Sequence, residues 1–255
     1  MPDPTPPPSR ALDGLPTTDP DSLRLLLDQA FEDGGFSARV ETGGGDALVS
    51  ATLLSTRFPF GSSAPLAAAW LEQEAVSPAR ARLDDAFNVV LDLSSAAAVQ
   101  RLIVVLLEPH IRAQTTAIAL REILAGHRIA HAADVHEADV VALTLWDCAD
   151  LDTAALFAGL LGAPGISDGL DLSRNRHLRR LADRLTWLAT GIAGSPVLAE
   201  ATPGCAHEPD QVSFLLTLGQ ARRLARRLDT ARPVASPLHG EQGPERSPDV
   251  AEGRA

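Results

Sequence analysis

The chain alternates between segments with strand-like and segments with helical hydrophobic spacing. Residues 139–162, DVVALTLWDCADLDTAALFAGLLG, alternate apolar and polar positions, pass through several aspartates and then take helical spacing up to a final glycine. Two other strand-like segments also start after an aspartate and end in Thr-Leu, at Thr52-Leu53 and Thr217-Leu218. Each of the three has a predicted helix and strand before it and a predicted helix after it. We interpret this pattern as three divergent α-β-β-α units.

The first predicted unit, residues 21–110, carries one additional β-α pair. Asp21 or Ser22 begins its first helix, and Gly34-Gly35 ends it. A glycine turn then joins two strands of a hairpin. The remaining elements follow in order: hairpin strands at 36–41 and 47–54, a short helix around 66–74, a strand at 87–93 and a helix at 96–107. Pro109 predicts a break after that last helix.

The second and third units are predicted at residues 111–165 and 166–230. Each has the predicted order helix, strand, strand, helix, with glycine or proline at its ends. The predicted elements are helices at 115–125, 153–161, 175–190 and 219–228, and strands at 128–135, 139–145, 195–201 and 212–218.

Single hairpins are marginally stable, so the strands are expected to merge into one or two antiparallel sheets covered by helices. The predicted fold class is therefore α+β. Residues 1–20 hold seven prolines and residues 231–255 hold four, with few apolar residues that could enter a core. We predict both ends as disordered tails.

Composition removes several classes of chemistry. The chain has no lysine and no tyrosine, which excludes a Schiff-base lysine, a phosphate-loop lysine and a catalytic tyrosine. Two cysteines give no disulfide framework, and there is neither a signal peptide nor an apolar run long enough to span a bilayer. These observations favour a cytoplasmic protein without membrane contact. The abundance of Ala, Arg, Gly and Pro indicates a bacterium with a high-GC genome.

Charge is distributed unevenly along the chain. The net charge is −11; residues 1–172 hold 10 Arg against 24 Asp and Glu (−14), whereas residues 173–232 hold 10 against 5 (+5). Most of the surface should therefore repel nucleic acid, except in the third unit.

The third unit contains the strongest candidate binding residues. Two predicted helices carry arginines at spacings of three and four, opposite their leucines. The candidates for binding an anion or a partner are Arg176, Arg179, Arg180, Arg184, Arg222, Arg223, Arg226 and Arg227. Guanidinium groups bind phosphates and carboxylates in a bidentate way. The alternatives are a solvated face or a contact with the acidic first two units. The absence of interleaved aromatic residues argues against single-strand stacking, and no helix-turn-helix is evident.

A histidine cluster gives a candidate metal site. His127, His131 and His136 lie near acidic residues, and imidazole with carboxylate suits Zn²⁺. His127 and His131 are four residues apart, but Gly126 is predicted to end the helix before them. The alternative interpretation is a solvated hairpin, and we assign no metal ligand.

Two turns share the pattern His-Glu-x-Asp, at residues 136–139 and 207–210. If they met, they would build a paired acid/base site; otherwise these residues serve chain reversal.

A further acidic group, Asp147, Asp150 and Asp152 with Cys148, can bind Mg²⁺ or Ca²⁺ or can stabilise the start of the next helix. No cation near Cys148 would lower its pKa, so a nucleophilic role lacks support.

The sequence therefore favours a non-catalytic interaction or regulatory protein with a protein partner, no cofactor and no assigned catalytic residue. Gly-x-Ser-x-Gly, Gly-x-Gly-x-x-Gly and Cys-x-x-Cys patterns are absent. The first alternative is a nucleic-acid-associated regulator using the arginines. The second is a metal-dependent enzyme at His127, His131 and His136.

Overall fold

The computed structural model describes residues 19–55, 58–149, 152–205 and 207–231. Nearly all of the two predicted disordered tails lies outside these residues. In chain order the elements are α1 (Pro20–Asp33), β1 (Ala38–Thr42), β2 (Val49–Leu53), α2 (Ala64–Gln73), β3 (Ala79–Leu83), β4 (Val89–Leu93), α3 (Ala96–Leu102), the π-helix η1 (Ile103–Leu107), α4 (Glu108–Gly126), β5 (His131–Glu137), β6 (Val140–Trp146), α5 (Thr153–Leu160), α6 (Asn175–Ala193), β7 (Ala199–Thr202), β8 (Gln211–Thr217) and α7 (Leu218–Asp229).

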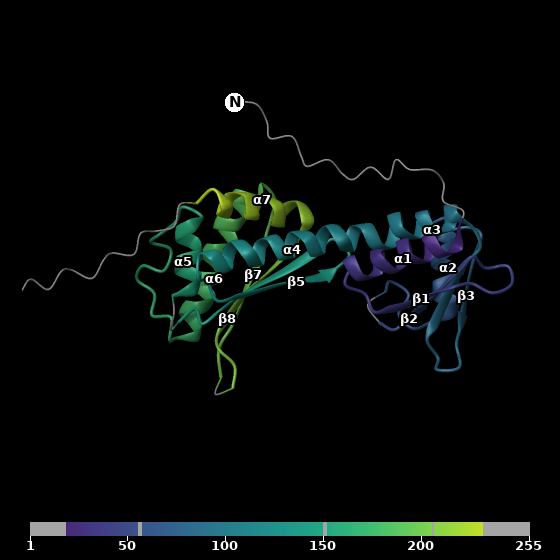
Figure 1. Ribbon diagram of the computed structural model, residues 1–255. Coiled ribbons are helices and arrows are strands. Elements are labelled where there is room, and N and C mark those ends of the chain that lie inside the picture. Colours follow the sequence, from purple (N-terminus) through teal and green to yellow (C-terminus); the bar gives the residue numbers. More distant parts are fainter. Residues whose placement is uncertain (1–18, 56–57, 150–151, 206, 232–255) are drawn as a thin grey trace, which may run out of the picture.

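The strands form two four-stranded antiparallel sheets, in the orders β1-β2-β4-β3 and β5-β6-β8-β7. The predicted α+β class with antiparallel sheets and helices is confirmed. The predicted three-unit repeat is not confirmed. Strands of the predicted second and third units pair in one sheet through β6 and β8, which agrees with the expectation that the hairpins merge. The molecule consists of two sheet-centred halves joined by one long helical segment (Figure 1).

That helical segment runs through α3, η1 and α4, and the predicted break at Pro109 is wrong. Pro109 lies in the first turn of α4, directly after the π-helical turn. The missing N–H of a proline is tolerated at such a position, and π-helical turns commonly interrupt longer helices without ending them. The boundary predicted between residues 110 and 111 falls inside this segment.

The sequence interpretation missed strand β3, with the sequence ARARL. Its alanines are half-buried and its arginines are exposed, so it alternates as a strand but with small apolar residues. β3 pairs with β4 at the edge of the sheet, and Arg82 of β3 forms an ion pair with Asp92 of β4, with Nε and Oδ2 2.8 Å apart.

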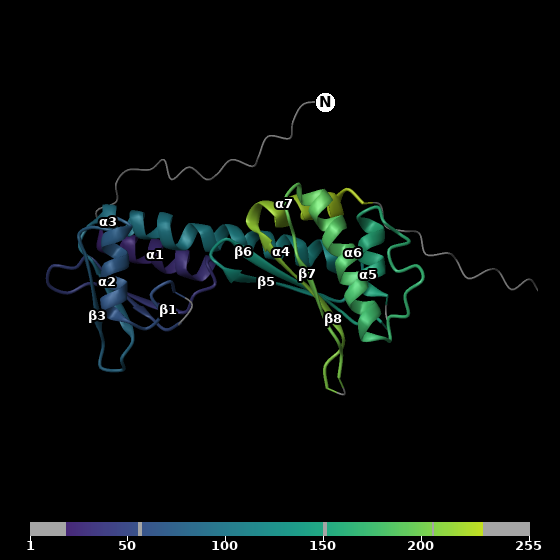
Figure 2. The same ribbon diagram turned by 180° about the vertical axis from the view of Figure 1, so that it is seen from behind.

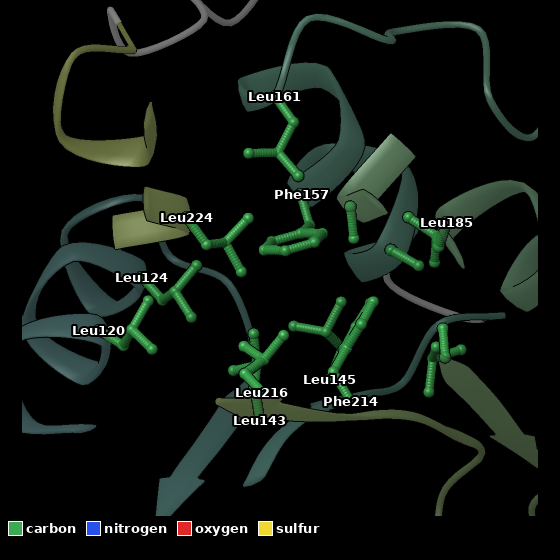
Figure 3. Packing of buried hydrophobic residues seen from close by; sticks show 14 of the residues in the cluster. Leu120, Leu124, Leu143, Leu145, Phe157, Leu161, Leu185, Phe214, Leu216 and Leu224 are labelled. Carbon is green, nitrogen blue, oxygen red and sulfur yellow. The ribbon is translucent and has the colours of Figure 1, made fainter. Parts of the chain in front are cut away.

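Each half has its own hydrophobic core on one face of its sheet. In the second half, α4, α5, α6 and α7 pack their apolar residues onto β6 and β8 (Figure 3). Phe157 of α5 contacts Phe214 of β8, with ring centroids 5.8 Å apart, and both side chains are fully buried. In the first half, the buried residues of α1, α2 and α3 pack onto β2 and β4. No helix in the described part of the chain is long and apolar enough to cross a membrane.

The opposite face of the first sheet is largely polar, whereas that of the second sheet mixes polar residues with the exposed Trp146 and Leu215. On the first sheet, Ser50 donates a hydrogen bond of 2.6 Å to Asp92, and Arg82 binds the other oxygen of the same carboxylate. On the second sheet, the hydroxyls of Thr144 and Ser213 lie 3.1 Å apart. The alternation of apolar and polar residues along the strands thus sets which face receives the helices.

Candidate partner-binding surface

Helices α6 and α7 pack beside each other on the second sheet (Figure 2). On α6 the buried residues include Leu178, Leu181 and Leu185, which keep helical spacing. On α7, Leu224 and Leu228 are buried in the same way. Because the leucines take the inner face, the arginines must occupy the outer one.

All eight predicted arginines lie at exposed positions of these two helices. The structure divides them into two groups by their contacts. The first group contacts the rest of the fold: Arg184 and Arg223 do so through hydrogen bonds, and Arg227 lies close to Gly162. The second group comprises Arg176, Arg179, Arg180, Arg222 and Arg226.

The first group holds helix ends and a loop in place. Arg184 donates hydrogen bonds to the carbonyl oxygens of Ile166, at 2.5 Å, and Asp168, at 3.2 Å, in the loop after α5. Arg223 donates to the carbonyl oxygen of Ala193, the last residue of α6. Arg227 lies so close to Gly162 that a β-carbon there would be 3.1 Å from its Nη2. A cation at a helix C-terminus satisfies free carbonyls and opposes the negative end of the helix dipole.

The second group makes no ion pair and no hydrogen bond through its side chains with any residue that the structure describes. The suggested contact with the acidic first two predicted units is therefore not made by these five side chains through any ion pair or hydrogen bond among the described residues. Five guanidinium groups of this surface are left for solvent or for a partner.

Trp187 of α6 is an aromatic residue that the sequence interpretation missed. Its side chain is 78% exposed. It lies seven residues after Arg180 and eleven after Arg176, a spacing that puts the three on one side of the helix. The expectation that the arginine surface has no aromatic residue is therefore wrong. A tryptophan on the side of α6 opposite its leucines was the signal available in the sequence.

The predicted histidine cluster is not brought together. His127 caps the end of α4, His131 begins β5 and His136 lies near the opposite end of that strand. The ring Nδ1 of His131 lies 2.7 Å from the carbonyl oxygen of Ile129, so part of its hydrogen bonding is local. Within the described ranges, no group of three or more His, Cys, Asp or Glu side chains is arranged to hold a metal ion.

The two His-Glu-x-Asp turns lie at opposite ends of the second sheet. Strands β6 and β8 are antiparallel, so Asp139, before β6, lies beside Leu218, whose N–H donates to its carbonyl oxygen. Asp210, before β8, lies at the other end and its carboxylate accepts a hydrogen bond from the N–H of Ala149 at 3.1 Å. The two turns therefore cannot form one acid/base site.

The acidic segment before α5 gives no evidence of a metal or a nucleophile. Asp152 takes the N-cap position of α5, as expected of an acidic residue at a helix start, although its side chain makes no capping hydrogen bond. Burial raises the pKa of the Cys148 thiol to about 12, with the nearby Asp210 carboxylate adding to the effect. A thiol with such a pKa is inert at neutral pH. Asp150 lies outside the described residues.

Comparison with known proteins gave no match: no family model, no curated protein and no solved structure is similar to this chain at the level searched.

Proposed function

We propose that the protein is a non-catalytic interaction protein that binds an acidic surface of a protein partner through the outer faces of α6 and α7. The observation that carries the proposal is the exposed Trp187 beside Arg176 and Arg180. Tryptophan and arginine are the residue types that contribute most to binding energy at protein interfaces. Because Trp187 is 78% exposed, burying its ring against a partner would add favourable hydrophobic free energy to binding.

Charge supports a partner that is acidic. Residues 173–232 have an excess of five positive charges, whereas residues 1–172 have an excess of fourteen negative ones. The arginines of the second group have no counter-charge among the described residues. Their planar groups pair with carboxylates in a bidentate way, so an acidic protein surface complements them.

The test is affinity capture from a lysate of the host cell with the tagged full chain, run with and without nuclease. One variant combines Trp187→Ala with Arg180→Glu. Its matched control combines Phe87→Ala with Arg39→Glu, because Phe87 is 77% exposed and Arg39 is exposed on the first half. We expect a nuclease-resistant protein, recovered in fixed ratio, that the control retains and the Trp187 variant loses. Equal recovery by both variants would overturn the proposal.

A second candidate function is association with nucleic acid through the same surface. Trp187 favours it, because an exposed aromatic ring among arginines can stack on a base. The net charge of −11 opposes it. This function predicts oligonucleotide binding whose affinity falls steeply as salt is raised, since phosphate contacts release counterions. If the full chain binds no oligonucleotide at low salt, this function is excluded.

A further inference from the structure

The imidazole of His110 is buried between the two halves and has no hydrogen-bond partner among the described residues. His110 lies in the first turn of α4 and is 7% exposed. Its ring contacts that of Phe36 edge-on, with centroids 4.5 Å apart. Within the described part of the chain no hydrogen bond reaches its side chain. In that same part, every side-chain nitrogen or oxygen that is fully shielded from solvent has a hydrogen-bond partner. The ring nitrogens must therefore open onto accessible space, and such a buried polar group requires an explanation.

Two hollows provide that space, and both are lined by His110 and His136. The smaller has a volume of about 200 Å³ and also touches Gln114 and Asp134. The larger has a volume of about 490 Å³, within the range of roughly 300–1,000 Å³ that is typical of small-ligand sites.

The larger hollow is apolar on one side and acidic on the other. The first half of the molecule contributes Trp70 and the helical segment contributes Val105 and Leu106. The second half contributes the turn between β5 and β6, with Glu137 and Asp139. A molecule in this hollow would contact both halves at once.

The two carboxylates at this hollow have no ion-pair partner among the described residues. Neither Glu137 nor Asp139 makes a side-chain hydrogen bond or ion pair with any described residue, and no arginine is among the described residues that line the hollow. The nearby histidines and carboxylates form no metal-binding group within the described ranges. The charge therefore suits a cation, and the apolar side suits one with a hydrocarbon body.

We propose that the larger hollow binds a small organic cation, an ammonium group carried on an aryl or alkyl body. Glu137 and Asp139 would attract the ammonium group. The ring of Trp70, with Val105 and Leu106, would contact the hydrocarbon body, and aromatic faces also attract cations. His110 would accept a hydrogen bond from the ammonium N–H.

The state of His110 fits that role. Burial lowers the pKa of the imidazole, while the negative charge of Asp139 acts in the opposite direction and is outweighed. The other titratable groups that line the hollow are His136 and Glu137. A neutral imidazole has one nitrogen with a free lone pair, which can accept a hydrogen bond from an ammonium group.

The test uses the full chain and two probes with the same phenethyl body, one carrying an ammonium group and the other a neutral hydroxyl. Titration calorimetry near pH 7.5 at low salt compares the phenethylammonium ion with neutral 2-phenylethanol. We expect the ammonium probe to bind several-fold more tightly, because only it can pair with the carboxylates. No binding of the ammonium probe, or equal binding of both probes, would overturn the proposal.

Isosteric variants locate the binding. Glu137→Gln and Asp139→Asn each remove one charge at an exposed position, so the fold should be retained, which circular dichroism can verify. Each should weaken binding of the ammonium probe about twofold to fivefold, the range of an exposed ion pair. Asp134→Asn is the matched control. Asp134 lies on β5, as Glu137 does, and it lines the smaller hollow but not the larger one. Unchanged affinity in the first two variants, or an equal loss in the control, would overturn the assignment to this hollow.

Discussion

The ring of Phe36 stands edge-on to the imidazole of His110, with centroids 4.5 Å apart and an interplanar angle of 75°. Phe36 follows α1 in the first half, and His110 begins the helix that enters the second. This aromatic contact therefore ties α1 to the long helical segment at the place where the two halves meet.

The burial of His110 makes stability depend on pH. Burial lowers the pKa of His110 in the folded state below that of the unfolded chain, so the unfolded chain binds the proton more readily. The contribution of His110 is complete above the unfolded pKa of about 6.5 and is lost as the pH falls towards the lower folded pKa. We expect the thermal midpoint to fall between pH 7.5 and pH 5, with a smaller fall in His110→Gln. Identical pH profiles for the two proteins would contradict this.

Arg223 should contribute to stability, whereas its neighbour Arg222 should not. Arg223 donates to the carbonyl oxygen of Ala193 at the end of α6, and Arg222 has no partner among the described residues. Arg223→Ala should lower the free energy of unfolding by about 0.5–1 kcal/mol. Arg222→Ala should change it by less than about 0.5 kcal/mol. Urea unfolding measures both, and equal losses would show that Arg223 does not stabilise α6.

Asp92 should stabilise the polar face of the first sheet. It accepts hydrogen bonds from Ser50, at 2.6 Å, and from Arg82, at 2.8 Å, and so links β2, β4 and β3. Asp92→Ala should cost about 1 kcal/mol in the free energy of unfolding. Glu41→Ala, on the same face and exposed, is the control and should cost little. A similar loss of unfolding free energy in both variants would indicate that negative charge on this face stabilises the sheet, and not the hydrogen bonds of Asp92.

The same carboxylate adds stability that acid removes. Burial acts to raise the pKa of Asp92, but the hydrogen bonds from Arg82 and Ser50 outweigh it, and the pKa is lowered from 3.8. The contribution is therefore present above that ordinary value and is lost as the pH falls through the lower folded pKa. Acid unfolding of Asp92→Ala should show a weaker dependence on pH in this range than wild type.

The two cysteines should differ sharply in reactivity. Cys205 is exposed, whereas Cys148 is buried and has its pKa raised to about 12. A disulfide reagent at pH 8 should modify Cys205 rapidly and should modify Cys148 only when the chain unfolds. Cys205→Ser should remove the rapid phase. A rapid phase that persists in this variant would show that the segment around Cys148 opens in the native state.

Sequence reasoning captured the elements whose pattern is local. The leucine spacing of α6 and the alternation of β6 and β8 identify them, because each buries one side against the core. It missed β3, since alanine gives weak contrast with arginine, and it placed a break at Pro109, since the π-helical turn before that residue has no evident pattern. The pairing of β6 with β8 depends on contacts about seventy residues apart along the chain, which local periodicity does not encode.

The candidate surface shows the same division. Helical spacing was sufficient to place the eight arginines on outer faces. It could not separate Arg184 and Arg223 from the rest, because their partners are backbone carbonyls of segments far along the chain. His110 was not identified either, since its importance comes from hollows lined by α4, residues 34–36 after α1, η1, and β5 with the β5–β6 turn.

The strand order has a consequence for synthesis on the ribosome. In each sheet the last strand to be made, β4 or β8, lies between two earlier ones. Among the described strands, β3 pairs with β4 alone and β7 with β8 alone, so neither can be paired until the following strand has left the exit tunnel. The first sheet can close once residue 93 has emerged, long before β8 is translated. The nascent chain should therefore acquire protease resistance in two separate steps, each set by the emergence of a central strand.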